Sequence, residues 1–376
     1  MAAVATITES SRPPLDAVLA ADLAFHLGDR DAYHLAAMEE RTCAVPAPDE
    51  AFVAFRIDRR QFFAGEFYKT HCRIGDAGIA ICDGVEIGKK QRRTLAAINR
   101  EFDRLGRSTP YAFELRDGRQ YDYAAIFGTT KPIPVFQYYR RKGRAAIIHP
   151  LLGFHDYPSK HIPKVDDRKP FLEKEPKAVW RGQLSGRVAW AGGYTGFSKV
   201  AAELTLSEDE KCAILFDQLP RAAICRRHAD NPLVDAGLTM SGAGLQRIAC
   251  VSAIAPLCRE RLSIEAQLFY RYLLAVDGND YPSSLYWMLS TNSLVLRQES
   301  PWEAFGECYF QPWVHYVPFA RDGSDLVEKI EWCEAHLSQC AGMVANAHRA
   351  WSVLFDADYQ TERRRAAHAA YRSWFD

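Results

Sequence analysis

The sequence predicts an α/β protein with two domains. The chain has 376 residues, which is more than one small core usually serves. Strand-like apolar runs alternate with helical periodicity in both halves of the chain. Between the halves, residues 155–177 contain four prolines and many charges without apolar periodicity, as is typical of a domain boundary.

The first half reads as helix, strand, helix and strand. Residues 14–40 repeat apolar side chains at helical spacing, and "FVAFRID" is typical of a short strand. Residues 91–106 form an amphipathic pattern that ends at Gly106. "PYAFELRDG" alternates like a strand and closes in an Asp-Gly turn, and "KPIPVFQYYRRKGRAAIIHP" adds two apolar runs around a basic turn.

The second half opens with "AVWRGQLSGR", residues 178–187, an apolar run followed by a glycine-bearing turn. Residues 268–298 predict a strand, a glycine turn, a helix and another strand. Residues 324–355 predict a helix, with Asp325 and Glu328 spaced as a capping box. In such sheets ligands bind where the strands end, so both glycine turns are expected to face a cleft between the domains.

Composition excludes several classes of protein. Lys+Arg and Asp+Glu both number 47, so a nucleic-acid binder that relies on a large basic field is not expected. The N-terminal residues lack the pattern of a secretory signal, and no stretch of about 20 uncharged apolar residues exists. The ten cysteines form no C-x-x-C pair and are expected to be reduced, mostly buried thiols in a cytoplasmic protein.

Two segments could hold an anion. Arg181 and Arg187 bracket Gly182 and Ser185, and two guanidiniums around a turn can bind a phosphate, although ordinary surface arginines would look the same. Residues 278–284 combine a tight turn at Gly278, with Asn279 and Asp280, and a helix start at Ser283 and Ser284. A helix N-terminus binds phosphate through backbone N–H groups, but a plain capped helix has the same pattern.

Other patterns leave alternatives open. Asp117 ends a strand where a general base could sit, but Asp-Gly is also a common turn pair. Residues 191–199 and 237–246 are glycine-rich without fitting a phosphate-binding motif, and we expect flexible loops there. His149, His155 and His161 lie six residues apart and predict no metal site. The C-terminal "ERRRAAHAAYRSWFD" predicts a helix that either packs its aromatic residues on the protein or docks on an anionic membrane.

Four pieces in order, over roughly residues 90–350, resemble glycosyltransferase family 90. They are "FELRDG" followed by "PIPVFQYY", then "VWRGQLSGR", then "YRYLLAVDGNDYPSSLYWMLSTNSLVL", and finally "PWVHYVPFARDGSDLVEKIEW". The last two are long and specific. The pattern departs from many family members at "YPSSLYW", because Ser283 and Ser284 stand where those members begin the helix with an arginine.

The resemblance implies a GT-B fold with two Rossmann-like domains, here residues 1–160 on the acceptor side and 161–350 for the nucleotide sugar. Residues 351–376 are then expected to form a helix that packs back across the first domain. It implies inverting transfer without a strictly required metal or other cofactor, so arginines, hydroxyls and helix N-termini must stabilise the leaving diphosphate. Asp117 is then the catalytic base, and the phosphate-binding set is Arg181, Gly182, Ser185, Arg187, Gly278, Asn279, Asp280, Ser283 and Ser284.

We therefore expect a cytoplasmic glycosyltransferase that moves a glucose- or xylose-type sugar from a UDP-sugar to a glycan or glycolipid, such as lipopolysaccharide core. One alternative is an inactive nucleotide- or glycan-binding member of the same fold. The other is a membrane-docked assembly partner that contacts the inner face of the membrane through its C-terminal helix. No nucleic-acid partner is expected.

Overall fold

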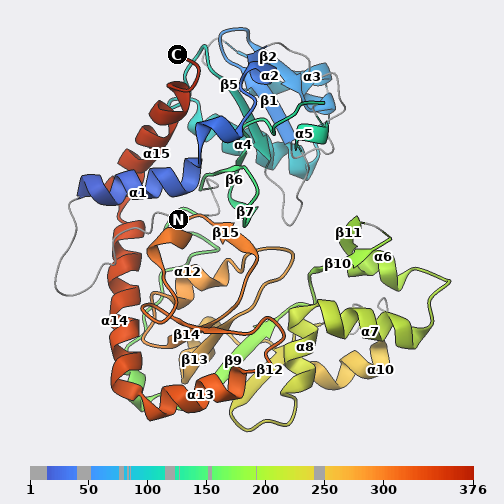
Figure 1. The fold of residues 1–376 in the computed structure, drawn as a ribbon, viewed down its shortest axis with the longest axis vertical. Coiled ribbons are helices and arrows are strands. Elements are labelled where there is room, and N and C mark those ends of the chain that lie inside the picture. Colours follow the sequence, from blue (N-terminus) through green and yellow to red (C-terminus); the bar gives the residue numbers. More distant parts are fainter. Residues whose placement is uncertain are drawn as a thin grey trace.

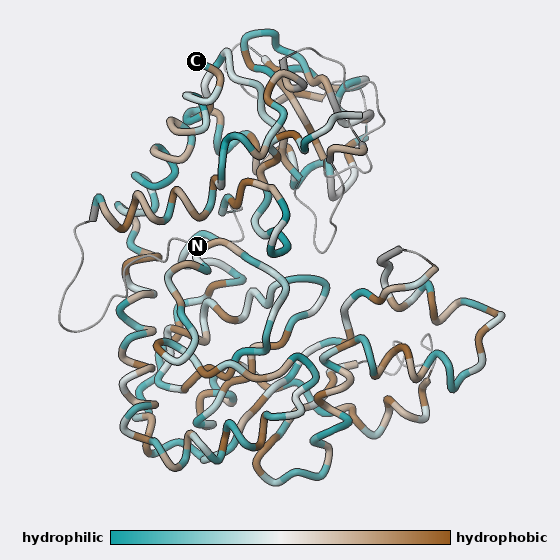
Figure 2. Tube along the Cα trace, viewed as in Figure 1, coloured by the Kyte–Doolittle hydropathy of each residue, from teal (hydrophilic) through white to brown (hydrophobic). Residues whose placement is uncertain are grey.

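The computed structural model describes residues 15–39, 52–75, 80–82, 84, 86–114, 123–126, 128–150, 155–191, 193–240 and 250–376. Within them the chain is a mixed α/β protein with two main sheets (Figure 1). Among the described residues no helix is both long and apolar enough to cross a bilayer. The same is visible along α14 and α15, where hydrophilic and hydrophobic residues alternate (Figure 2).

The C-terminal sheet is parallel throughout and has the strand order β12-β9-β13-β14-β16. In chain order this is 2-1-3-4-5, the arrangement of a doubly wound sheet. Its strands are β9 (Glu175–Gly182), β12 (Val234–Leu238), β13 (Tyr270–Ala275), β14 (Leu294–Gln298) and β16 (Val317–Phe319).

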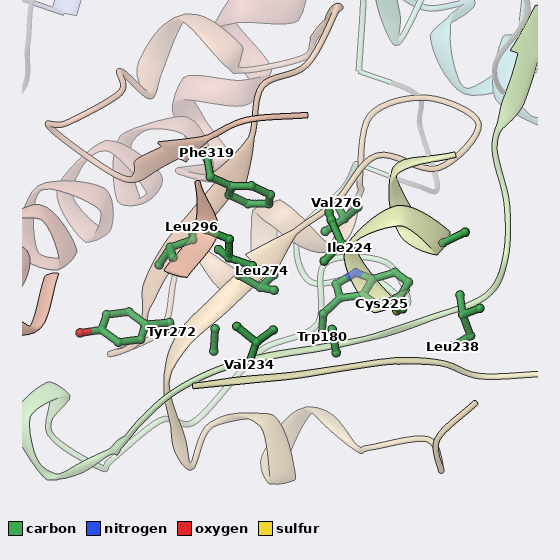
Figure 3. Packing of buried hydrophobic residues seen from close by; sticks show 14 of the residues in the cluster. Trp180, Ile224, Cys225, Val234, Leu238, Tyr272, Leu274, Val276, Leu296 and Phe319 are labelled. Carbon is green, nitrogen blue, oxygen red and sulfur yellow. The ribbon is translucent and has the colours of Figure 1, made fainter. Parts of the chain in front are cut away.

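Both faces of this sheet are buried, as expected for parallel strands covered by helices. Trp180 of β9 lies in one apolar cluster with Ile224 and Cys225 of α8 (Figure 3). Its neighbour Val179 points to the opposite face and packs with α12 and α14. The covering helices are α7 (Glu208–Gln218), α8 (Pro220–Arg227), α10 (Val251–Ile254), α11 (Ile264–Gln267), α12 (Ser284–Met288), α13 (Leu326–Ala335) and α14 (Leu337–Leu354).

The N-terminal sheet is mixed and has the order β2-β1-β5-β6-β8. The first three strands are antiparallel, and β5, β6 and β8 are parallel. The strands are β1 (Phe52–Arg56), β2 (Gln61–Ala64), β5 (Pro110–Glu114), β6 (Phe136–Gln137) and β8 (Ile147–Ile148). The helices of this half are α1 (Leu15–Leu27), α2 (Ala36–Glu39), α3 (Glu66–His71), α4 (Lys89–Glu101) and α5 (Tyr123–Ile126).

Contacts join the two halves. β7 (Tyr139–Arg141) pairs with β15 (Trp302–Ala304), and Arg140 Nε lies 2.7 Å from Glu303 Oε2. The final helix α15 (Ala357–Arg372) lies against the N-terminal half, where the Tyr371 hydroxyl donates to the Pro110 carbonyl at 2.9 Å. The division at residues 160 and 350 stays a prediction.

The aromatic residues of the C-terminus point into the protein. Tyr371 is fully buried, the Trp374 ring stacks on Tyr33 with centroids 5.5 Å apart, and Phe375 packs against Tyr371. Much of the apolar surface of these side chains is therefore used within the fold, and docking of this helix on a membrane stays a prediction.

Several local expectations are wrong. The helix expected over 14–40 ends at Leu27, because Gly28 adopts a φ of +73°. The capping box does not form, because Asp325 Oδ1 instead accepts the Ala320 N–H at 2.7 Å. Part of the expected 191–199 loop is regular: β11 (Gly193–Gly196) pairs with β10 (Arg187–Trp190) and α6 (Phe197–Ala201) follows.

The expectation that all cysteines are reduced also fails. Cys72 and Cys82 face each other in the hairpin of β3 (Cys72–Ile74) and β4 (Ala80–Cys82) and form a disulfide. The spacing of the cysteines along the chain could not predict this pair, because only the antiparallel register of the two strands places the residues opposite each other.

Candidate functional site

The candidate site lies where β9 and β13 end. These neighbouring strands flank the point at which the strand order reverses, because β12 follows β9 in the chain but lies on its other side. Doubly wound proteins bind ligands outside the carboxyl ends of the strands at this point. Two loops meet here: residues 183–186 after β9, and residues 276–280 after β13.

Arg221 of α8 holds the two loops together. Its Nη1 donates to Ser185 Oγ at 2.7 Å and to the Gln183 carbonyl at 3.0 Å, while Nε donates to the Asp277 carbonyl at 3.0 Å. The guanidinium lies 5.4 Å from the centre of the Trp180 ring, an arrangement that favours a cation. Burial lowers the pKa of Arg221 to about 10, so the side chain stays charged at neutral pH. Arg221 and the two loops together form a framework.

Sequence reasoning missed Arg221. Its hydrogen-bond partners lie between 36 and 56 positions away in the chain, and most of them are backbone carbonyls. No local motif reports such contacts. The one signal in the sequence is indirect: an arginine in the first turn of a helix that starts with Pro220, ahead of the apolar run at residues 222–225.

The two loops of the framework also touch directly. A Cβ placed on Gly278 would lie 2.7 Å from Ser185 Oγ and 2.8 Å from Arg221 Nη2, so a larger residue would force one of these side chains to move. The Asn279 side chain accepts the Gly186 N–H at 3.1 Å. The structure therefore brings together Ser185, Gly278 and Asn279, three of the residues expected to bind phosphate.

Asp277 and Asp280 place two carboxylates beside this framework. Asp277 is buried and accepts a hydrogen bond from Ser300 Oγ at 2.8 Å, while Arg321 Nη1 lies 3.6 Å away. Burial raises the pKa of Asp277 to about 6, against the lowering effect of the Ser300 hydrogen bond. Tyr138 of the N-terminal half donates to Asp280 Oδ2 at 3.4 Å, so this turn also contacts the other half.

Arg181 is not the open guanidinium that the sequence suggested. It belongs to β9, and its Nη2 pairs with Asp235 Oδ1 at 2.7 Å. Its Nη1 donates to the Asp235 and Trp180 carbonyls, and its Nε donates to the Glu260 carbonyl. Arg187 begins β10 in a separate two-stranded sheet. The two arginines thus belong to different elements, and a phosphate-binding role for either stays a prediction.

A pocket of about 920 Å³ adjoins the framework. Its walls are the end of β9, residues 239–240 after β12, the segment 258–267 and α12. Arg181, Gly182 and Ser284 line it together, so three further predicted residues share one cavity. Ser283 precedes α12 but makes no capping hydrogen bond through its side chain. The volume falls in the usual range of roughly 300–1,000 Å³ for small-molecule sites.

Asp117 lies outside the described residues, as do residues 241–246 of the second glycine-rich segment. The strand β5 that precedes Asp117 ends at Glu114 and pairs with β6 in parallel. The role of Asp117 as a base stays a prediction.

Comparison with known proteins identifies the region around β13. Residues 228–354 match the family model described as Glycosyl transferase family 90. This stretch includes Gly278, Asn279, Asp280 and α12 but begins after Arg221.

Three relatives illustrate the similarity. The chain is 29% identical to O-glucosyltransferase LpsA of Dichelobacter nodosus over 197 residues, 52% of this chain and 49% of that protein. It is 40% identical to Protein O-glucosyltransferase 2 of Danio rerio over 67 residues, 18% of this chain and 13% of that protein. It is 27% identical to Uncharacterized protein 035R of Invertebrate iridescent virus 3 over 256 residues, 65% of this chain and 22% of that protein. The matches thus span about half the length of these relatives or less. The family match and these similarities together support a glycosyltransferase family 90 assignment for the region around β13.

Proposed function

We propose that the chain is an inverting glycosyltransferase of the GT-B type that uses a UDP-sugar. The observation that carries the proposal is the framework at the end of β9 and β13, where Arg221 joins two polar loops beside a pocket. The parallel sheet with this framework is the donor-binding half. The mixed N-terminal sheet is the acceptor half.

The framework suits a diphosphate. Arg221 supplies a fixed positive charge, and its contacts with Ser185 and with the carbonyls of Val276 and Asp277 prevent the loops from moving apart. The adjacent pocket, lined by Arg181 and Ser284, has room for a nucleoside and a sugar. Fixed cationic and hydrogen-bonding groups can stabilise a leaving diphosphate in the role that a metal ion fills elsewhere.

The chemistry is a single displacement. An acceptor hydroxyl oxygen attacks the anomeric carbon from the face opposite the diphosphate, Asp117 takes its proton, and the bond from that carbon to the diphosphate oxygen breaks. UDP leaves with the electron pair of that bond. One general base is enough for this reaction, and such a base typically contributes about 10²–10⁴-fold in rate.

The names of two relatives favour glucose as the transferred sugar, because both are O-glucosyltransferases. We propose a glycan or glycolipid acceptor such as lipopolysaccharide core. The relative LpsA is named an O-glucosyltransferase, which supports transfer to a hydroxyl oxygen.

The test is turnover of UDP-glucose and UDP-xylose without added metal, measured as release of UDP with and without a glycan acceptor. We expect slow release of UDP without an acceptor and faster release when the acceptor is present. Arg221→Lys should impair release because lysine lacks the planar fork that makes these contacts. Arg226→Lys on the exposed side of the same helix is the matched control and should leave release unchanged. A folded protein that binds UDP but releases none from either donor would contradict the transferase proposal and indicate an inactive binding member.

A further inference from the structure

Three side chains from distant parts of the chain meet beneath α15. Glu101 ends α4, His149 directly follows β8, and His368 lies on α15. His149 Nε2 lies 3.2 Å from Glu101 Oε1, and His368 Nε2 lies 3.4 Å from Glu101 Oε2. One ligand atom from each residue falls within 4.8 Å of the others, and all three residues are buried.

The spacing of the three side chains is compatible with a tetrahedral metal. Zinc binds imidazole nitrogen at about 2.0–2.1 Å and carboxylate oxygen at about 2.0–2.2 Å, so tetrahedral neighbours lie about 3.3–3.5 Å apart. The two imidazoles lie 3.2 and 3.4 Å from different oxygens of the Glu101 carboxylate, and one ligand atom of each residue falls within 4.8 Å of the others. Small side-chain movements would bring one carboxylate oxygen and both nitrogens to that edge length.

Two guanidiniums lie near the cluster, and neither pairs with Glu101 in the described part of the chain. Arg363 Nε pairs with Asp22 at 2.7 Å, while its Nη1 and Nη2 are buried without a hydrogen-bond partner within the described ranges, and Arg364 Nη2 pairs with Asp156 at 3.1 Å. Among the residues that the structure describes, the only groups within ion-pair distance of Glu101 are the two imidazoles.

The surroundings of the cluster are apolar. The Phe136 ring stacks on His368 at 5.7 Å, and Tyr111 contacts the same imidazole at 5.9 Å. His368 faces Glu101 through Nε2, and its other ring nitrogen, Nδ1, is buried without a hydrogen-bond partner in the described part of the chain. An ion at this cluster would therefore be bound through Nε2 in water-poor surroundings.

We propose that Glu101, His149 and His368 bind a Zn²⁺ ion that fixes α15 to α4 and the N-terminal sheet. Two imidazoles and a carboxylate supply three of the four ligands of a tetrahedral zinc site, and a water molecule would supply the fourth. The role is structural: the ion joins elements far apart in sequence and takes no part in sugar transfer. Spacing among His149, His155 and His161 could not predict it, because the other ligands lie 48 positions before and 219 positions after His149.

The test is a titration of chelator-treated, folded full-length protein with Co²⁺, followed by Zn²⁺. The expected result is one equivalent of Co²⁺ with the visible absorption of a tetrahedral site, lost when Zn²⁺ displaces it. The other described clusters that could hold a metal, Asp22 with His26 and Cys308 and Glu208 with Cys212 and Cys250, both contain a cysteine. Binding there would add a thiolate-to-cobalt charge-transfer band in the near ultraviolet, which the proposed site cannot produce.

Variants locate the ion. His368→Gln should weaken Co²⁺ binding by more than the roughly 10–100-fold typical of losing an outer-shell partner, and should abolish the rise in Tm that Zn²⁺ gives the wild type. His336→Gln, at a half-buried histidine between α13 and α14, should change neither.

The wild-type titration decides the matter even if His368→Gln does not fold. A wild-type protein that is folded by circular dichroism but binds no Co²⁺ saturably would overturn the proposal. A thiolate band as the only signal would do the same, as would tetrahedral absorption that survives in folded His368→Gln.

Discussion

The two sheets differ in the direction of their strands, and the candidate site lies at the edge of only one of them. All five strands of the C-terminal sheet are parallel, so their carboxyl ends meet at one edge, where Arg221, Ser185 and Gly278 gather. In the N-terminal sheet only β5, β6 and β8 run parallel. That half instead buries its polar cluster, Glu101 with two histidines, under the C-terminal helix.

We therefore expect nucleotide affinity and reaction rate to depend on different halves of the molecule. If the C-terminal edge binds the donor and the segment after β5 supplies the base, substitutions in one half should alter binding and those in the other should alter turnover. The following predictions test this separation.

The largest effect is expected from Asp117→Asn. Removing a general base should slow transfer by about 10²–10⁴-fold, because the acceptor hydroxyl loses its proton acceptor. The affinity for UDP should not change. Steady-state kinetics and a UDP titration check the two parts, with Asp103→Asn at an exposed surface position as the control. Full activity in Asp117→Asn would remove this residue from the mechanism.

The next largest effect concerns Asp277 and pH. Burial raises its pKa from 3.8 to about 6, so the folded state holds a proton that the unfolded chain has already released. Stability from this group is therefore present at low pH and is lost as pH rises from about 4 to about 6. The shift corresponds to about 3 kcal/mol.

Asp277→Asn should remove this pH-dependent loss of stability, while the amide oxygen still accepts the Ser300 hydrogen bond. The free energy of unfolding is measured with denaturant at pH 5 and pH 8. Relative to the wild type, the variant should gain stability at pH 8. Asp217→Asn at an exposed position is the control. If the free energy of unfolding changes with pH in the same way in the wild type and in Asp277→Asn, the buried carboxylate does not cause the loss of stability.

A smaller effect on UDP affinity is expected from substitution of Arg181, and two possible roles of this side chain can be separated. If its guanidinium contacts the donor, Arg181→Ala should weaken UDP binding by ~1.5–3 kcal/mol, the value of a charge-assisted hydrogen bond. Asp235→Asn should then leave UDP affinity nearly intact, because the guanidinium remains in place. Equal losses of stability in both variants without any change in UDP affinity would instead show that Arg181 serves only to pair with Asp235.

The smallest effect is expected from Gly278→Ala. The added methyl would enter the space of Ser185 Oγ and Arg221 Nη2, and overpacking of this kind typically costs about 1–3 kcal/mol. We expect weaker UDP binding with little change in the N-terminal half, measured by titration and by Tm.

The control for Gly278→Ala is Gly143→Ala. A Cβ at Gly143 would meet nothing within 4 Å, but the φ of this residue is +79°, so the variant tests backbone strain without overpacking. Unchanged UDP affinity in Gly278→Ala would argue against a tight contact between the loops.

The sequence predicted the C-terminal sheet better than the site built on it. The strand–turn–helix–strand unit of β13, α12 and β14 was predicted because apolar periodicity and the Asp-Gly turn are local signals. Arg221 was missed because its partners are distant backbone carbonyls. Arg181 was read as open because its partner Asp235 comes from the neighbouring strand β12, and strand order cannot be read from spacing.

In the N-terminal half, too, contacts between elements that are distant in the chain could not be predicted from the sequence. The disulfide between Cys72 and Cys82 and the cluster of Glu101, His149 and His368 both depend on which elements lie side by side. A related limit appears in the C-terminal half. The long helix expected over 324–355 is in fact two helices, α13 and α14, that meet at His336, although apolar periodicity continues across that residue.

The most direct test of the central claim is a calorimetric titration of the folded protein with UDP in the absence of added metal. We expect UDP to bind saturably to the wild type. Arg221→Lys should weaken this binding by ~1.5–3 kcal/mol, and Arg226→Lys should leave it unchanged. No saturable binding to the wild type, or equal affinity in wild type and Arg221→Lys, would contradict the claim that the framework at the ends of β9 and β13 holds the donor.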